Sequence, residues 1–154
     1  MTSARRSLAI STLLLSTLIL AGCDKPNPSV TVWSGTNSEH EQAVCWQPDG
    51  AALTAKECAQ EVLDAAAAGQ DIPRLDVTPG ATVGISVDHA VAEAGWSIQI
   101  AGQTLAAGLT DTYYRFTFPE QVSTGGTGST MQVTAAAEGG TGVRGHWFFQ
   151  LVPS

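Results

Sequence analysis

The sequence predicts a mainly β protein: a two-sheet antiparallel sandwich with one inserted short α-helix, preceded by a signal peptide. Apolar and polar residues alternate in several short runs, at 83–87, 96–100, 114–118 and 131–135, as they do in half-buried strands. Gly, Pro, Ser and Thr fill the segments between these runs, where turns are expected. A length of 154 residues suits one domain, and the 14% charged residues are too few for a disordered acidic tail.

The first 22 residues have the pattern of an export signal. Arg5 and Arg6 provide a positive start, and residues 8–20 follow as an apolar run without charge. As a helix this run would cover only about 20 Å, which is short of the roughly 30 Å hydrocarbon core of a bilayer. The pattern therefore favours a signal peptide over residues 1–22 rather than a permanent transmembrane helix.

The signal ends in a lipobox pattern, Leu20-Ala21-Gly22-Cys23, in which an aliphatic residue and two small residues precede a cysteine. We expect Cys23 to be acylated and to hold the protein in the lipid bilayer, on the extracytoplasmic face of the cell membrane. The alternative is an ordinary signal peptide with a chance cysteine. Residues 23–28 form a short, proline-stiffened membrane tether, and residues 29–154 form the predicted sandwich domain.

Charge excludes one class of partner. The chain carries 14 Asp and Glu against seven Lys and Arg, and without Arg5 and Arg6 its formal charge falls to about −9 at neutral pH. Such a surface repels nucleic-acid phosphates, because non-specific binding to them depends on Lys and Arg. We therefore expect no nucleic-acid partner.

Two cysteines remain after Cys23, at Cys45 and Cys58. An even pair in an exported chain predicts a disulfide. The alternative, a metal site, lacks any Cys-x-x-Cys or His-x-His spacing beside either residue. We expect no metal and no cofactor.

The pattern changes from strand to helix between two predicted strands, 29–34 and 40–46, and the β-rich remainder of the chain. Thr54 and Glu57 have the spacing of a capping box, and apolar residues then recur at helical intervals until Gly69, a typical helix terminator. These residues predict a helix near 54–68.

The β half of the chain resembles an immunoglobulin-like fold. A Pro-Gly turn, GATVGISV, GWSIQIAGQTL, YYRFTF, MQVTAAA and a final aromatic strand follow in the order of strands B, C–C′, E, F and G. Trp96 falls where such domains often keep a buried strand-C tryptophan. Together with the lipobox, the tether and the cysteine pair, this half is also similar to an actinobacterial lipoprotein family of unknown function. That resemblance implies an uncharacterised envelope role.

Candidate catalytic groups are sparse. His40, His89 and His146 are far apart in sequence, and the glycine-rich segment Ser123–Thr130 lacks the lysine of a phosphate-binding loop. The sequence also lacks the Gly-x-Ser-x-Gly elbow of serine hydrolases.

A non-catalytic binding or structural role at the cell envelope therefore fits best, with an envelope protein as a candidate partner. One alternative is a small envelope hydrolase using paired carboxylates near Glu57 and Glu61. Another is an accessory subunit of an envelope transport or wall-synthesis complex. A flat acidic or aromatic face would favour the binding protein, whereas a deep pocket with two facing carboxylates would favour the hydrolase.

Overall fold

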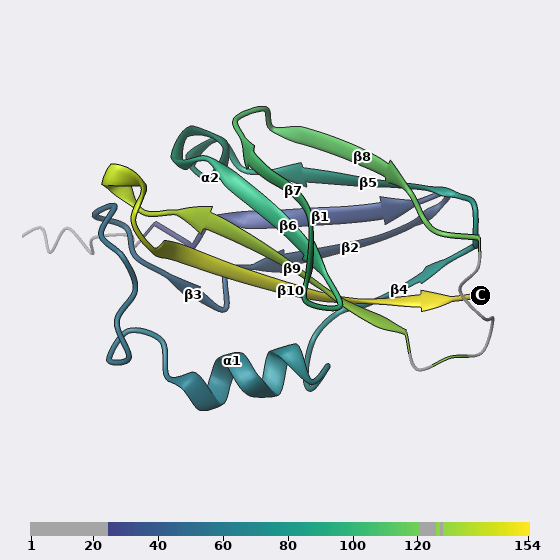
Figure 1. The fold of residues 1–154 in the computed structure, drawn as a ribbon, viewed down its shortest axis with the longest axis horizontal. Coiled ribbons are helices and arrows are strands. Elements are labelled where there is room, and N and C mark those ends of the chain that lie inside the picture. Colours follow the sequence, from purple (N-terminus) through teal and green to yellow (C-terminus); the bar gives the residue numbers. More distant parts are fainter. Residues whose placement is uncertain (1–24, 121–125, 127) are drawn as a thin grey trace, which may run out of the picture.

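The computed structural model describes residues 25–120, 126 and 128–154, and two sheets pack face to face within them (Figure 1). The predicted sandwich is confirmed, but it carries a second short helix, His89–Ala94, which the sequence did not predict. The signal peptide and Cys23 lie outside the described residues. No helix in the described part of the chain has the length and apolar character needed to cross a bilayer.

In chain order the elements are β1 (Ser29–Ser34), β2 (Asn37–Gln42), β3 (Cys45–Trp46), α1 (Gln60–Ala67), β4 (Arg74–Val77), β5 (Thr82–Val87), α2 (His89–Ala94), β6 (Trp96–Ile100), β7 (Gln103–Leu109), β8 (Tyr113–Thr117), β9 (Ser129–Ala136), the 3₁₀ turn η1 (Glu138–Gly140) and β10 (Val143–Pro153).

The first sheet has the strand order β2-β1-β5-β8, and every neighbouring pair is antiparallel. Alternation within β1 turns Val30 and Val32 inward, where both are fully buried. Strands β1 and β2 are joined by a two-residue turn in which Gly35 has a positive φ of 58°. Glycine adopts this conformation without steric cost, which suits a tight hairpin.

The second sheet has the order β3-β10-β9-β6-β7, and β4 adds to it by parallel pairing with β10. Strands β5, β6–β7, β8, β9 and β10 occupy the places of strands B, C–C′, E, F and G in an immunoglobulin-like sandwich. Helix α1 lies along the β10 side of this sheet, away from the first sheet (Figure 1). The Thr130 hydroxyl donates to the carbonyl of Ala67 at 3.0 Å and so ties the end of α1 to β9.

The single strand predicted over 40–46 is wrong. Strand β2 ends at Gln42 in the first sheet, and β3 begins at Cys45 in the second. Between them the amide of Ala43 donates to the carbonyl of Pro28, and that of Val44 donates to the carbonyl of His146. The chain crosses from the first sheet to the second here. Buried and more exposed side chains still alternate along these residues, although they do not form one strand.

The helix predicted near 54–68 is present but shorter. The Thr54 amide does donate to the Glu57 carboxylate at 2.9 Å, yet this contact closes a separate turn. Ala59 is extended (φ −65°, ψ 139°), so α1 begins only at Gln60. The intervening Cys58 is bonded to strand β3, which takes the backbone off the helical path. Gly69 follows the helix with a positive φ of 81°, as predicted.

The predicted disulfide is confirmed. Cys45 and Cys58 are bonded with their Cα atoms 5.7 Å apart, and each is 7% exposed. Because Cys45 lies in the second sheet and Cys58 immediately precedes α1, the bond fastens the helix entry to the sheet edge.

Reducing this bond should destabilise the domain by about 2–4 kcal/mol, since the unfolded chain regains the freedom of the closed loop. The free energy of unfolding in urea, measured with and without reducing agent, checks this expectation. The double variant Cys45→Ser/Cys58→Ser should be insensitive to the reducing agent. An unchanged wild-type midpoint on reduction would contradict the prediction.

Two tryptophans occupy the core between the sheets. Trp96 is 1% exposed, and its indole N–H donates to the carbonyl of Asp111 at 2.8 Å. Trp147 is fully buried, and its indole N–H donates to the carbonyl of Pro28 at 3.0 Å. Both polar ring atoms are satisfied, as buried indoles require. The second bond also pins residues 25–28, the end of the tether, to the sandwich.

Replacing Trp96 by alanine should cost about 3–5 kcal/mol, through lost transfer energy and the cavity left behind. This is a large share of the roughly 5–15 kcal/mol that holds a domain together. Thermal unfolding followed by circular dichroism measures the loss. A melting temperature within a degree or two of wild type would show that Trp96 is not the core residue described above.

Candidate functional site

The outer face of the first sheet combines two aromatic rings with small polar side chains. Because Val30 and Val32 point inward, Thr31 and Trp33 point outward, and the cross-strand registers place the remaining outward positions. Helix α1 lies on the other side of the sandwich and leaves this face open (Figure 1). We call the set the aromatic face: Ser29, Thr31 and Trp33 of β1; Ser38, His40 and Gln42 of β2; Thr82, Gly84 and Ser86 of β5; and Tyr113, Arg115 and Thr117 of β8.

Trp33 lies flat on the strand beside it. It pairs with Gly84 of β5, and a methyl group added at Gly84 would overlap the indole atoms Cε2, Cζ2 and Nε1. Gly84 is therefore buried under the ring, whereas Trp33 itself is only half-buried. A glycine within a strand often marks such a close approach.

Tyr113 extends the flat surface. Its ring is nearly parallel to that of Trp33, at an interplanar angle of 13°, and the two centroids are 6.4 Å apart. Parallel rings in direct contact are separated by only about 3.5–4 Å, so the phenol is displaced sideways from the indole instead of covering it. Tyr113 is 42% exposed. The two nearly parallel rings thus lie beside each other on the face, and both are at least partly open for stacking.

Hydrogen-bonding groups surround these rings. The Thr31 hydroxyl lies 2.9 Å from Nδ1 of His40, on the row that continues through Ser86 to Tyr113. Arg115 pairs with Gly84 on the next row, beside Trp33. Hydroxyls donate and accept, while the guanidinium only donates. The face can therefore stack on a ring and bond to its substituents, without any arranged nucleophile or acid.

The aromatic face also lacks carboxylates, although the chain carries 14 Asp and Glu residues. Glu39 and Glu41 belong to β2, but they pair with Val32 and Val30 and so project to the opposite side of the sheet. Asp88 lies at the rim, where it accepts from the amide and hydroxyl of Ser29. The twelve residues of the aromatic face thus include no carboxylate.

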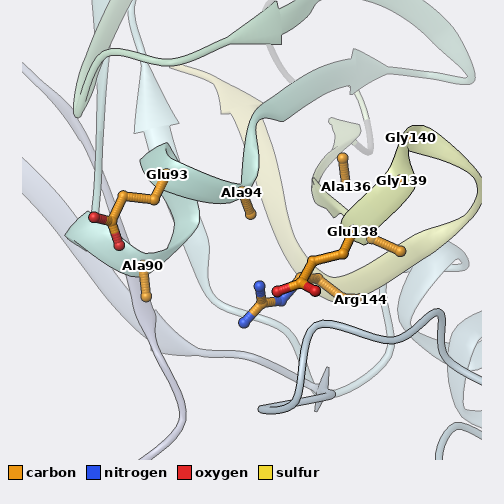
Figure 2. Close-up of a pocket in the computed structure, with 9 residues that line it drawn as sticks. Ala90, Glu93, Ala94, Ala136, Glu138, Gly139, Gly140 and Arg144 are labelled. Atoms are coloured by element: carbon orange, nitrogen blue, oxygen red, sulfur yellow. The ribbon is translucent and has the colours of Figure 1, made fainter.

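A pocket of about 410 Å³ lies between α2 and η1 (Figure 2). The guanidinium carbon of Arg144, which lines it, lies 4.2 Å from the centroid of the Trp46 ring, in a cation–π contact. The Arg144 Nε atom is buried without a hydrogen-bond partner among the described residues. A neighbouring pocket shares Arg144 and is lined by tether residues, so both hollows lie at the end of the sandwich where the tether leaves.

The two carboxylates of the Figure 2 pocket do not face each other. The Glu93 carboxylate is 3.2 Å from His89 Nε2 on exposed surface, and its side chain turns away from Glu138 (Figure 2). Glu138 instead folds over Gly50, and its amide donates to the Gly50 carbonyl at 2.8 Å. Acid–base hydrolysis of a glycoside needs two carboxylates that flank one bond, and this pocket does not present them so.

The structure separates most other residues singled out from the sequence. Glu57 is engaged by Thr54, and Glu61 is exposed in the first turn of α1. Within the described ranges, no three His, Cys, Asp or Glu side chains gather as a metal site would require. Half of the Ser123–Thr130 segment lies outside the described residues, and its last two residues begin strand β9.

Sequence reasoning did not find the aromatic face, because Trp33 and Tyr113 are 80 positions apart in the chain. The available signal was Gly84, a glycine between β-branched residues in a predicted strand.

Comparisons with known protein families, curated proteins and solved structures found no match to this chain. Its function must therefore be inferred from its own geometry.

One further polar group lies on the outer face of the second sheet. His146 Nδ1 is 2.9 Å from the Gln132 amide nitrogen, and the imidazole stacks on Phe148 with 13° between the ring planes. Burial lowers the pKa of His146 from its usual value of 6.5. The neutral ring can accept the Gln132 amide proton at Nδ1, and protonation there would remove that acceptor.

The depressed pKa predicts that His146 destabilises the fold in acid. As the pH falls below about 6.5, the unfolded chain binds a proton at this residue before the folded chain does, so stability is lost. Above that pH the contribution is fully present. Melting temperatures between pH 7.5 and 5.5 should fall more steeply for wild type than for His146→Gln, which cannot titrate. Equal slopes would contradict this assignment.

Proposed function

We propose that the chain is a lipid-anchored, extracytoplasmic protein that binds a component of the cell envelope without catalysis. The aromatic face carries the proposal, because two parallel rings lie open on a sheet surface ringed by hydroxyls. Exposed apolar surface with a polar rim is typical of binding sites.

The proposed lipid anchor is supported mainly by the residues that precede the domain. The lipobox at Cys23 supplies the acylation site, and the Cys45–Cys58 bond suits an oxidising compartment. The carbonyl of Pro28 accepts from both Ala43 and Trp147, which fixes the position at which the tether leaves the domain. Only five residues separate Cys23 from the start of β1, so the anchored domain would stay close to the bilayer.

A binding role has more support than the hydrolase alternative. The carboxylates suggested for hydrolysis lie on exposed surface around α1, and Glu57 is already bonded to Thr54. The aromatic face holds rings, hydroxyls, a histidine and an arginine, which suit recognition. A surface rather than a deep cleft also suits a ligand that is itself extended.

The experiment separates anchoring from binding in one fractionation. Envelopes from cells of the source bacterium that produce the full chain are labelled with radioactive palmitate and then extracted with a non-ionic detergent. Wild type should carry label and stay with the sedimented wall, because detergent removes the membrane but not the ligand of the aromatic face. Cys23→Ser should carry no label, since the acylated thiol is missing.

Trp33→Ala should keep the label but pass into the detergent supernatant. Val62→Ala is the matched control, because Val62 is 46% exposed on α1, away from the aromatic face. Label on Cys23→Ser would refute the anchor. Release of wild type and Trp33→Ala to the same extent would refute envelope binding by this face.

A further inference from the structure

We infer that the ligand of the aromatic face is a neutral polysaccharide of pyranose rings in the gluco configuration, with or without N-acetyl groups. This inference rests on the proposed function, since it names the ligand of the same surface. Three properties of the face lead to it: its flatness, its lack of carboxylates and the polar groups around its rings.

Flatness selects a ring-shaped ligand. The Trp33 indole lies against the β5 backbone because Gly84 has no side chain, and Tyr113 continues the surface in a nearly parallel plane. In a gluco-configured pyranose the hydroxyls are equatorial, so the axial C–H bonds make both ring faces apolar. Such a face can lie on an aromatic ring and exclude water from both surfaces. The centroid separation of 6.4 Å allows neighbouring sugars of one chain to use both rings.

The distribution of charge disfavours strongly charged ligands. The aromatic face contains no carboxylate that would bind a cationic peptide. The rest of the protein carries an excess of acidic residues, which repels strongly anionic polymers over distances of about a Debye length. A neutral polysaccharide needs no carboxylate partner, and the acidic residues do not repel it. Arg115 then acts as a hydrogen-bond donor to sugar oxygens rather than as a partner for phosphate.

The polar groups match a polyol. Thr31, Ser86 and His40 lie on one cross-strand row that ends at Tyr113, and Arg115 lies beside Trp33 on the next row. Hydroxyls and imidazole can donate or accept as each sugar hydroxyl requires. Stacking would provide affinity, while these edge contacts would select the orientation of the sugar.

The test titrates the full lipidated chain with cellohexaose and, separately, with chitohexaose, which distinguishes plain from N-acetylated sugars. The protein is kept in a polyoxyethylene detergent, because detergents with sugar headgroups would compete. Tryptophan fluorescence is a suitable signal, since Trp96 and Trp147 are buried and Trp33 is not. We use a Trp46→Phe background, which leaves Trp33 as the accessible indole.

Wild type should bind at least one of the two sugars saturably, and calorimetry should give the same dissociation constant as fluorescence. Calorimetry measures the variants, because Trp33→Ala removes the fluorescent reporter. Trp33→Ala and Tyr113→Ala should each weaken binding about tenfold or more, as loss of a stacking ring does elsewhere. Gly84→Ala should also weaken it, because the added methyl lifts the indole from the sheet. Val62→Ala should bind like wild type.

Several results would overturn the inference. No saturable binding of either sugar by wild type would refute the ligand class, as would equal affinity of wild type, Trp33→Ala and Tyr113→Ala. Circular dichroism identifies any variant that fails to fold, and the exposed position of Tyr113 makes its variant the safer measure. If wall retention depends on Trp33 but neither sugar binds, the proposed function stands and only the ligand class is wrong.

Discussion

The burial of Trp96 and Trp147 between the two sheets is the interaction on which the rest of the structure depends. Each indole fills the core and donates its N–H to a backbone carbonyl in a connecting segment, at Asp111 and Pro28 respectively. The first bond fixes the loop before β8, the strand that carries Tyr113. The second fixes the tether against the sandwich. Core packing thus also positions the loop before β8 and the tether, the two segments next to the proposed binding face and the proposed anchor.

The sequence determines the sandwich better than it determines the site. Alternation identified most strands because each sheet buries one face, and that constraint is local. It could not show that the chain changes sheets between Gln42 and Cys45, because the alternation is preserved across the crossing. The start of α1 was misplaced for a related reason, since the disulfide at Cys58 overrides a favourable local cap.

The aromatic face lay beyond prediction because it exists only through long-range pairing. Trp33 meets Gly84 when β1 pairs with β5, and Tyr113 joins them when β5 pairs with β8. A shift of one residue in either register would turn one of these side chains to the other face. The absence of carboxylates from this face likewise depends on register, since Glu39 and Glu41 alternate with Ser38 and His40 along β2.

Two locally unfavourable choices coincide at this site. Glycine inside a strand is destabilising by roughly 0.5–1 kcal/mol relative to alanine, and an indole left half-exposed forgoes part of its burial energy. Each choice is unexplained alone, but Gly84 provides the space in which Trp33 lies flat. Sequences tend to break such rules where function requires it. The second sheet differs, because Phe148 of β10 lines a hollow together with Ala67 at the end of α1 and is only 1% exposed. No helix among the described residues covers Trp33 on the first sheet, which is why we place recognition there.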